Sequence, residues 1–265
     1  MSWKWEELTA PEFARALEAV EQTCLLPLGV LEKHGEHLPL GMDVLAAARV
    51  AERAVALEPA ILFPTFYYGQ IHEAKQYPGT IAIRHDLMAA LLENLCEEIA
   101  RNGCRKIVLL NGHGGNENFL GQFAFRMLES PRAFTLYIIT LSHYLRPTLG
   151  SEEWKAMMES EFDEHGGEAE TSVMLAINPE LVKLEQRGPV GAPQKRLAHL
   201  PCATPVWWYA DFPTHYAGDA ARATAEKGEF LLRAYSTRVA EILTAVKADI
   251  EAPRLQAEYT ARTQH

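Results

Sequence analysis

Three polar segments of the chain carry the residue types that could do chemistry. The first places Glu32, His34 and Asp43 within twelve residues, and the second places His113 in a run rich in glycine and asparagine. The third, residues 165–172, begins with a histidine and contains two glutamates. Neutral imidazole and carboxylate groups are the ordinary protein ligands of Zn²⁺, Mn²⁺ and Fe²⁺. A single histidine near a strand end is more often an ordinary hydrogen-bonded residue, but three such segments together predict a metal centre.

The spacing in the first segment is compatible with two neighbouring metal ions. Glu32 and His34 are two residues apart, so in an extended stretch their side chains share one side and could bind neighbouring ions. A two-metal site also needs a carboxylate that reaches both ions. Asp43 is placed for this, because we expect it to open a helix and point back toward the preceding loop. The segment could therefore bind two divalent ions per chain, which could be Zn, Mn or Fe.

The glycine-rich second segment has a competing interpretation, since such loops after strands also bind phosphate groups. Residues 111–116 read Asn-Gly-His-Gly-Gly-Asn. This run lacks the glycine spacing and the lysine of a P-loop, and it lacks the Gly-x-Gly-x-x-Gly pattern of dinucleotide-binding proteins. The sequence therefore favours the metal interpretation.

Strand and helix patterns alternate along the chain. We expect strands at 23–30, 61–63, 106–110 and 134–140, and helices at 11–20, 43–57, 86–102, 116–128, 152–163 and 221–248. Such alternation predicts an α/β fold with a mostly parallel sheet covered on both faces, in one domain over residues 1–265. In these sheets ligands bind beyond the carboxyl ends of the strands, where the first two polar segments fall.

One further region, residues 188–217, is punctuated by proline and glycine and contains the aromatic run Trp207-Trp208-Tyr209. We expect these rings to pack in the core or against another subunit. The alternative is that they form a wall or lid of the pocket.

Composition excludes several kinds of partner. The 265 residues carry a formal net charge of −10, which argues against nucleic acids and anionic membrane surfaces. No apolar run approaches the roughly 20 residues needed to span a bilayer, and the first ten residues lack a signal-peptide pattern. The four cysteines show no Cys-x-x-Cys spacing and are too few for a disulfide framework. We therefore expect reduced thiols and a cytoplasmic protein.

Four motifs, taken together, resemble the creatininase family. They are LGVLEKHGEHLPLGMD at 28–43, YPGT at 77–80, NGHGGN at 111–116 and HGGEAETS at 165–172, in that order. The resemblance extends over roughly residues 20–245. It implies a three-layer αβα sandwich with a mostly parallel sheet, a binuclear metal site, and a homo-oligomer that is commonly a hexamer.

The resemblance also implies a role for each site residue. Glu32 and His113 would hold one ion, His34 would hold the other, and Asp43 would bridge them. The remaining acidic ligand would be Glu170, with Glu168 as the alternative. His165 would lie beside the metals as a proton donor, and we predict His165 and Glu168 as the catalytic residues. His37 would support the ligands without binding metal.

Such a site predicts an amidohydrolase that cleaves a linear or cyclic amide C–N bond of a small, nitrogen-rich metabolite. The family includes hydrolysis of creatinine, deformylation of a formamidopyrimidine nucleotide and cleavage of a modified peptide precursor, and the sequence does not choose among them. The alternative from another class is a non-catalytic ligand-binding or assembly protein that retains the fold. That alternative predicts a broken ligand set, whereas the set here is complete.

Two departures from the family pattern affect these expectations. Creatinine-hydrolysing members follow the histidine of the second motif with an aromatic residue and a metal-binding glutamate, where this chain has Gly114 and Gly115. We therefore predict that Glu170 takes over the ligand role, that the pocket is wider, and that creatinine is a poor substrate. Many members also carry a histidine just after the glutamate at position 73, where this chain has Ala74. This leaves the role of the His72–Glu73 loop open.

Overall fold

The computed structural model describes residues 2–263, and its centre is a parallel four-stranded sheet in the order β2-β1-β3-β4. The strands are β1 (Thr23–Leu28), β2 (Ile61–Leu62), β3 (Lys106–Asn111) and β4 (Thr135–Ile139). β1 pairs with β3 along its whole length, from Thr23 opposite Lys106 to Leu28 opposite Asn111. The expected parallel sheet is confirmed.

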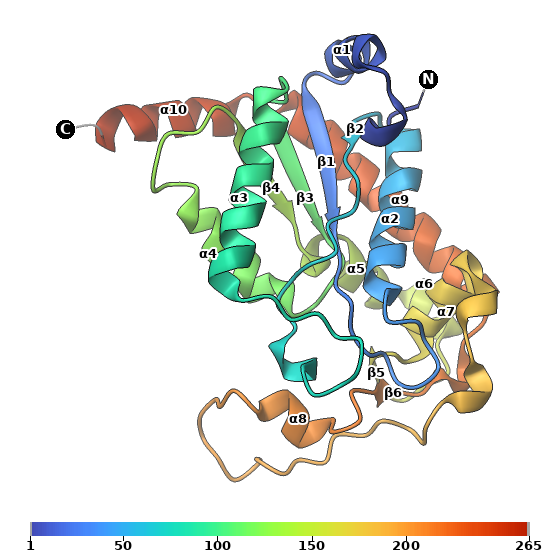
Figure 1. The fold of residues 1–265 in the computed structure, drawn as a ribbon. Helices are drawn as coiled ribbons and strands as arrows, with labels where there is room; N and C mark the ends of the chain where they lie inside the picture. Colours follow the sequence, from blue (N-terminus) through green and yellow to red (C-terminus); the bar gives the residue numbers. More distant parts are fainter. Residues whose placement is uncertain (1, 264–265) are drawn as a thin grey trace.

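Helices cover both faces of this sheet, which makes three layers (Figure 1). Successive side chains of a strand point to opposite faces, so the two faces draw on alternate residues of β1. Leu26 and Leu28 pack with α1 (Ala10–Ala19), α3 (His85–Arg101) and α4 (Asn116–Arg126). Leu25 packs on the other side with α2 (Met42–Leu57) and α9 (Ala225–Ala248). The predicted sandwich is therefore confirmed.

A second, small antiparallel sheet lies beyond the carboxyl ends of the main strands (Figure 1). It pairs β5 (Asp163–His165) with β6 (Ala217–Gly218) and places His165 opposite Ala217. The other helices are α5 (Leu141–Leu149), α6 (Glu152–Met157), α7 (Glu168–Ile177), α8 (Trp207–Asp211) and α10 (Glu251–Thr263). Short 3₁₀ turns span Trp5–Glu7, His72–Ala74, Pro179–Leu181, Leu184–Gln186 and Ala220–Arg222.

The helix predicted over residues 152–163 is wrong beyond its first half. It ends at Met157, and Asp163–His165 forms a strand. The reason is a tertiary contact, because the backbone N–H groups of Glu159 and Ser160 donate to the Glu168 carboxylate instead of to helix carbonyls. The first strand also ends at Leu28, two residues before its predicted end. Within residues 2–263, no helix is both long and apolar enough to cross a membrane.

Candidate metal centre

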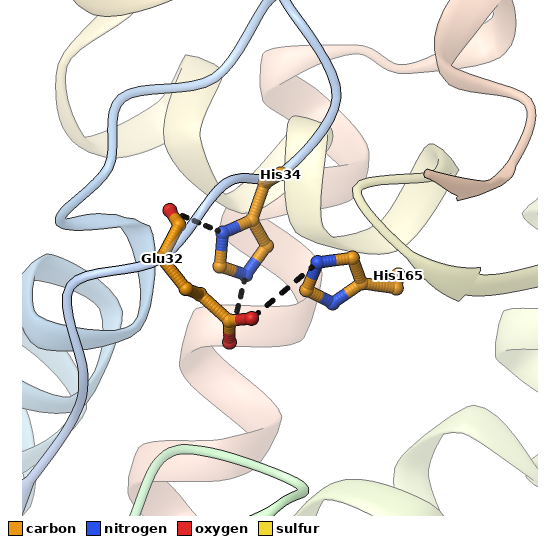
Figure 2. Close-up of side chains that lie close together, drawn as sticks. All are labelled: Glu32, His34 and His165. Carbon is orange, nitrogen blue, oxygen red and sulfur yellow. Dashed lines mark hydrogen bonds and ion pairs between the residues drawn. The ribbon is translucent and has the colours of Figure 1, made fainter. Parts of the chain in front are cut away.

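The carboxyl end of the sheet gathers the predicted metal ligands into one buried cluster. Glu32 and His34 follow β1, His113 follows β3, and Asp43 lies in the first turn of α2. These residues are between 0% and 7% exposed. Glu170 comes from α7, and its side chain is 28% exposed. Figure 2 shows Glu32 and His34 pointing toward one another, with His165 beside them.

One set of possible ligands consists of Glu32, Asp43 and His113. His113 Nδ1 lies 2.8 Å from Glu32 Oε1 and 2.9 Å from Asp43 Oδ2. The other ring nitrogen, Nε2, lies 2.8 Å from the Gln70 carbonyl oxygen. A carbonyl only accepts, so Nε2 carries a hydrogen, and Nδ1 is the ring atom turned toward the two carboxylates.

The carboxylate oxygens of this set lack donors. Within the described residues, neither Glu32 Oε1 nor Asp43 Oδ2 accepts a hydrogen bond, although both atoms are buried. Buried acceptors without partners are costly. Three converging lone pairs in a dry site fit a divalent cation, which would satisfy all of them at once.

A second set of possible ligands consists of His34, Asp43 and Glu170. His34 Nε2 lies 3.2 Å from Asp43 Oδ1 and 3.8 Å from Glu170 Oε2. Asp43 belongs to both sets and turns a different oxygen to each, Oδ2 toward His113 and Oδ1 toward His34. This geometry allows one carboxylate to serve two cations, as expected from its place at the start of a helix.

The buried carboxylates of the cluster stabilise positive charge on the groups beside them. Burial by itself would lower the pKa of His34, but the Asp43 and Glu32 carboxylates outweigh burial and raise that pKa to about 10. His113 behaves in the same way, and its pKa lies well above the ordinary value. Burial opposes ionisation of Glu32, yet the surrounding imidazoles hold its pKa well below the ordinary value. Protons or metal ions can supply this charge, and ligands of this type bind metal in competition with protons.

His165 lies against the second set without the close carboxylate contacts of the other histidines. Its ring stacks on His34 with centroids 4.2 Å apart, and Nε2 lies 2.9 Å from the Lys33 carbonyl oxygen and 3.8 Å from Glu32 Oε2 (Figure 2). Burial first, and then the charge of His34, hold the pKa of His165 well below its ordinary value. The side chain is 12% exposed, so a neutral imidazole reaches the edge of the cluster. It also forms a third set of possible ligands with Glu32 and His34.

Glu168 does not join the cluster. Its side chain is fully buried, and one oxygen lies 2.5 Å from Lys227 Nζ on α9. Both carboxylate oxygens also accept backbone N–H groups from residues 159 and 160. The geometry therefore gives no support to the predicted catalytic role of Glu168, or to its alternative role as a ligand. It assigns the side chain to holding the chain after α6 against α7.

Residues outside the ligand sets position the segments that carry the proposed ligands. His37 Nε2 lies 3.0 Å from both the Gly166 carbonyl and Thr171 Oγ1, so this ring joins the first polar segment to the third. The loop before the Tyr-Pro-Gly-Thr turn provides the Gln70 carbonyl that orients His113. Gln70 in turn donates from its side-chain amide to Glu73 at 2.6 Å. The question left open for this loop is answered in part, because it positions a candidate ligand.

The two glycines after His113 differ in their surroundings. A Cβ at Gly115 would lie 2.5 Å from His113 Nε2 and 2.7 Å from the Gln70 carbonyl, so no side chain fits there without moving that imidazole. A Cβ at Gly114 would meet nothing closer than 3.9 Å. A glutamate at position 115 is therefore incompatible with this arrangement, and Glu170 is the acid that completes the second set.

Sequence reasoning missed His215. Its Nε2 lies 2.7 Å from Glu32 Oε2, and its Nδ1 accepts a hydrogen bond from the indole N–H of Trp208 at 2.9 Å. The only nearby signal was the aromatic run at 207–209, for which core or subunit packing was the preferred interpretation. Trp208 instead packs edge-on against His165, with centroids 5.7 Å apart, whereas Trp207 is 56% exposed.

Fold and site together define a class: a three-layer α/β protein with a buried carboxylate–imidazole cluster that could hold metal, at the carboxyl ends of a parallel sheet. The family model described as creatinine amidohydrolase matches residues 6–243. The chain belongs to this family, the creatininases.

Several curated relatives are named hydrolases. Creatinine amidohydrolase of Pseudomonas putida is 28% identical over 256 residues, covering 89% of this chain and 94% of the relative. The mycofactocin precursor peptide peptidase of Mycobacterium ulcerans is 33% identical and covers 77% of each chain. The 3-dehydro-scyllo-inosose hydrolase of Thermotoga maritima is 29% identical, covering 77% of this chain and 71% of the relative.

Solved creatininase structures share the fold. A structure described as creatininase with Mn matches with a TM-score of 0.75 and 26% identity, covering 94% of this chain and all of the other. A mutant creatininase of Zn–Zn type matches with a TM-score of 0.78 and 25% identity over the same shares.

Proposed function

We propose that this protein is a binuclear metal-dependent amidohydrolase that cleaves an amide C–N bond, linear or cyclic, of a small nitrogen-rich metabolite. The observation that carries the proposal is the sharing of Asp43 between two imidazole–carboxylate sets. Glu32 and His113 would hold one ion, His34 and Glu170 the other, with Asp43 bridging. Mn and Zn are the favoured ions, since similar structures are described as Mn and Zn–Zn forms, and Fe suits the same ligands.

Two divalent cations held in this way would polarise a carbonyl oxygen and lower the pKa of water. The protein supplies the proton transfers. His165 carries its hydrogen on Nε2, where it donates to the Lys33 carbonyl, so Nδ1 remains an acceptor. A proton taken up on Nδ1 could be delivered to the departing nitrogen, and the lowered pKa of the ring favours that release. Trp208 packs against this ring and limits its movement.

The substrate is proposed to be bulkier than creatinine. Gly114 and Gly115 add no aromatic wall, and the space beside Gly114 is open to 3.9 Å. A formamide or a modified peptide is the alternative within the family, and one relative is a named peptide peptidase.

Metal analysis combined with steady-state assays tests the proposal. We expect about two ions per chain in the purified protein, because each of the two ligand sets fits one cation. The Zn- and Mn-loaded forms should hydrolyse creatinine with kcat/KM well below the ordinary enzyme range of about 10⁴ M⁻¹s⁻¹. A value above that range would refute the substrate proposal. Well under one ion per chain would instead favour the non-catalytic alternative.

The family resemblance further supports a homo-oligomer, proposed as a hexamer, in the cytoplasm. Trp207 and Tyr209 on α8 are 56% and 45% exposed, as expected of rings available to another subunit. All four cysteines are free, and three of them are buried. Light scattering at micromolar concentration tests the oligomer, and a monomer would contradict it. A nucleic-acid or membrane partner remains outside the proposal because of the acidic charge.

A further inference from the structure

We propose that His215 is a positioning residue for Glu32, and that Trp208 sets the tautomer in which it acts. This inference rests on the proposed function, because Glu32 is taken to be a metal ligand. It assigns a role to the segment before β6, which none of the motifs covers.

The hydrogen-bond chain has a single consistent direction. An indole N–H only donates, so His215 Nδ1 accepts the bond from Trp208 at 2.9 Å. In a neutral ring the hydrogen is then on Nε2, which donates to Glu32 Oε2 at 2.7 Å. One oxygen of the Glu32 carboxylate is thereby occupied, while the other, Oε1, accepts no hydrogen bond from the described residues and faces His113.

The two oxygens of the Glu32 carboxylate therefore have different partners, which fixes the orientation of the carboxylate as a ligand. Oε2 is held from outside the cluster, so Oε1 is turned inward, 2.8 Å from His113 Nδ1. Ligating carboxylates are themselves commonly hydrogen-bonded, and loss of such a partner typically costs 10–100-fold in metal affinity. His215 is 2% exposed, so solvent does not compete for this hydrogen bond in the intact protein.

The backbone around His215 is built to bring this ring to Glu32. The pairing of β5 with β6 places His165 opposite Ala217, and the rings of His165 and His215 have centroids 4.6 Å apart. The carbonyl of His215 accepts from the N–H of Gly35, next to His34. His215 adopts φ +55°, a left-handed conformation that is uncommon outside glycine and is concentrated at functional sites.

Two amide substitutions separate hydrogen bonding from packing. In His215→Gln the amide nitrogen lies as many bonds from Cβ as imidazole Nε2, so it can still donate to Glu32. In His215→Asn the amide nitrogen reaches only the position of Nδ1. Metal affinity is measured by competition with a chromophoric chelator for Zn²⁺, and the visible spectrum of the Co²⁺-loaded protein reports the ligand geometry.

We expect His215→Ala to lower the affinity for the ion held by Glu32 and His113 by roughly 10–100-fold, with the affinity for the second ion little changed. His215→Gln should restore most of the affinity and the Co²⁺ spectrum, whereas His215→Asn should not. Trp208→Phe keeps an aromatic ring but removes the indole N–H. It should cause a smaller loss of affinity for the same ion. His199→Ala, at an exposed position in the same region, is the matched control and should bind both ions normally.

The outcomes distinguish this inference from the proposed function. Equal affinity in the Gln and Asn variants, or an unchanged affinity in His215→Ala, would overturn the positioning role while leaving the binuclear site intact. A wild-type chain that binds no ion would overturn both. Thermal unfolding of each variant identifies any that fail to fold, and the Gln–Asn comparison then decides, since both variants carry the same amide group.

Discussion

Replacing Asp43 by asparagine should weaken the binding of both metal ions. Asp43 Oδ2 lies 2.9 Å from His113 Nδ1 and Oδ1 lies 3.2 Å from His34 Nε2, so one side chain faces both proposed ligand sets. Asparagine keeps the shape and one carbonyl oxygen but loses the negative charge. Because Asp43 is only 2% exposed, solvent does not screen that charge effectively.

The size of the effect follows from the lost charge. Two unit charges about 4 Å apart interact by about 4 kcal/mol at an effective dielectric constant of about 20. The ions are divalent, so this value is a lower bound; since 1.4 kcal/mol is a factor of ten in affinity, each ion should bind at least on the order of 10³-fold more weakly. Glu170→Gln changes a carboxyl group in one set only, at a more exposed position, and should therefore weaken the binding of one ion and spare the other.

The assay is the metal content after dialysis against increasing chelator, measured on the intact protein with activity followed in parallel. Asp43→Asn should lose both ions over the same chelator range, and Glu170→Gln should lose one. Asp86→Asn changes an exposed carboxylate on α3 that pairs with Arg84, and serves as the control. Loss of a single ion from Asp43→Asn, with the other fully retained, would show that this carboxylate does not bridge.

Three further predictions test the neighbouring residues. His165→Ala should keep its metal while kcat falls on the order of 10²–10⁴-fold, as for a lost general acid, and loss of metal would make His165 a ligand instead. Gly115→Ala should reduce bound metal because the added Cβ lies 2.5 Å from the His113 ring, whereas Gly114→Ala, with 3.9 Å of room, should bind metal normally; equal behaviour of the pair in metal analysis would contradict the steric argument. Lys227→Met should lower the free energy of unfolding by roughly 3–5 kcal/mol, because it leaves the Glu168 carboxylate buried without its cation, and denaturant unfolding should show partial recovery in the double variant with Glu168→Leu. A stable Lys227→Met protein would mean that Glu168 is not held by this pair.

Much of the fold could be predicted because local patterns agree with the tertiary structure. The strand at 106–110 is a continuous apolar run after Lys106, and the helices at 43–57 and 86–102 have apolar residues at helical spacing. The failure at 158–163 has a different origin. Those residues are compatible with a helix, but the N–H groups of Glu159 and Ser160 donate to Glu168, which comes from a later element. A local pattern carries no information about a partner that arrives by folding.

The sequence by itself determined the family, the three polar segments and the identity of the candidate ligands, because the spacing of Glu32, His34 and Asp43 depends only on neighbours in the chain. Only the tertiary structure decided which glutamate of the third segment faces the cluster, because residues 168 and 170 lie on different sides of one helix. It also added His215, which reaches Glu32 through a strand pairing between residues some fifty positions apart in the chain. Such a contact leaves no periodicity or motif, since it depends on where two distant segments meet in space.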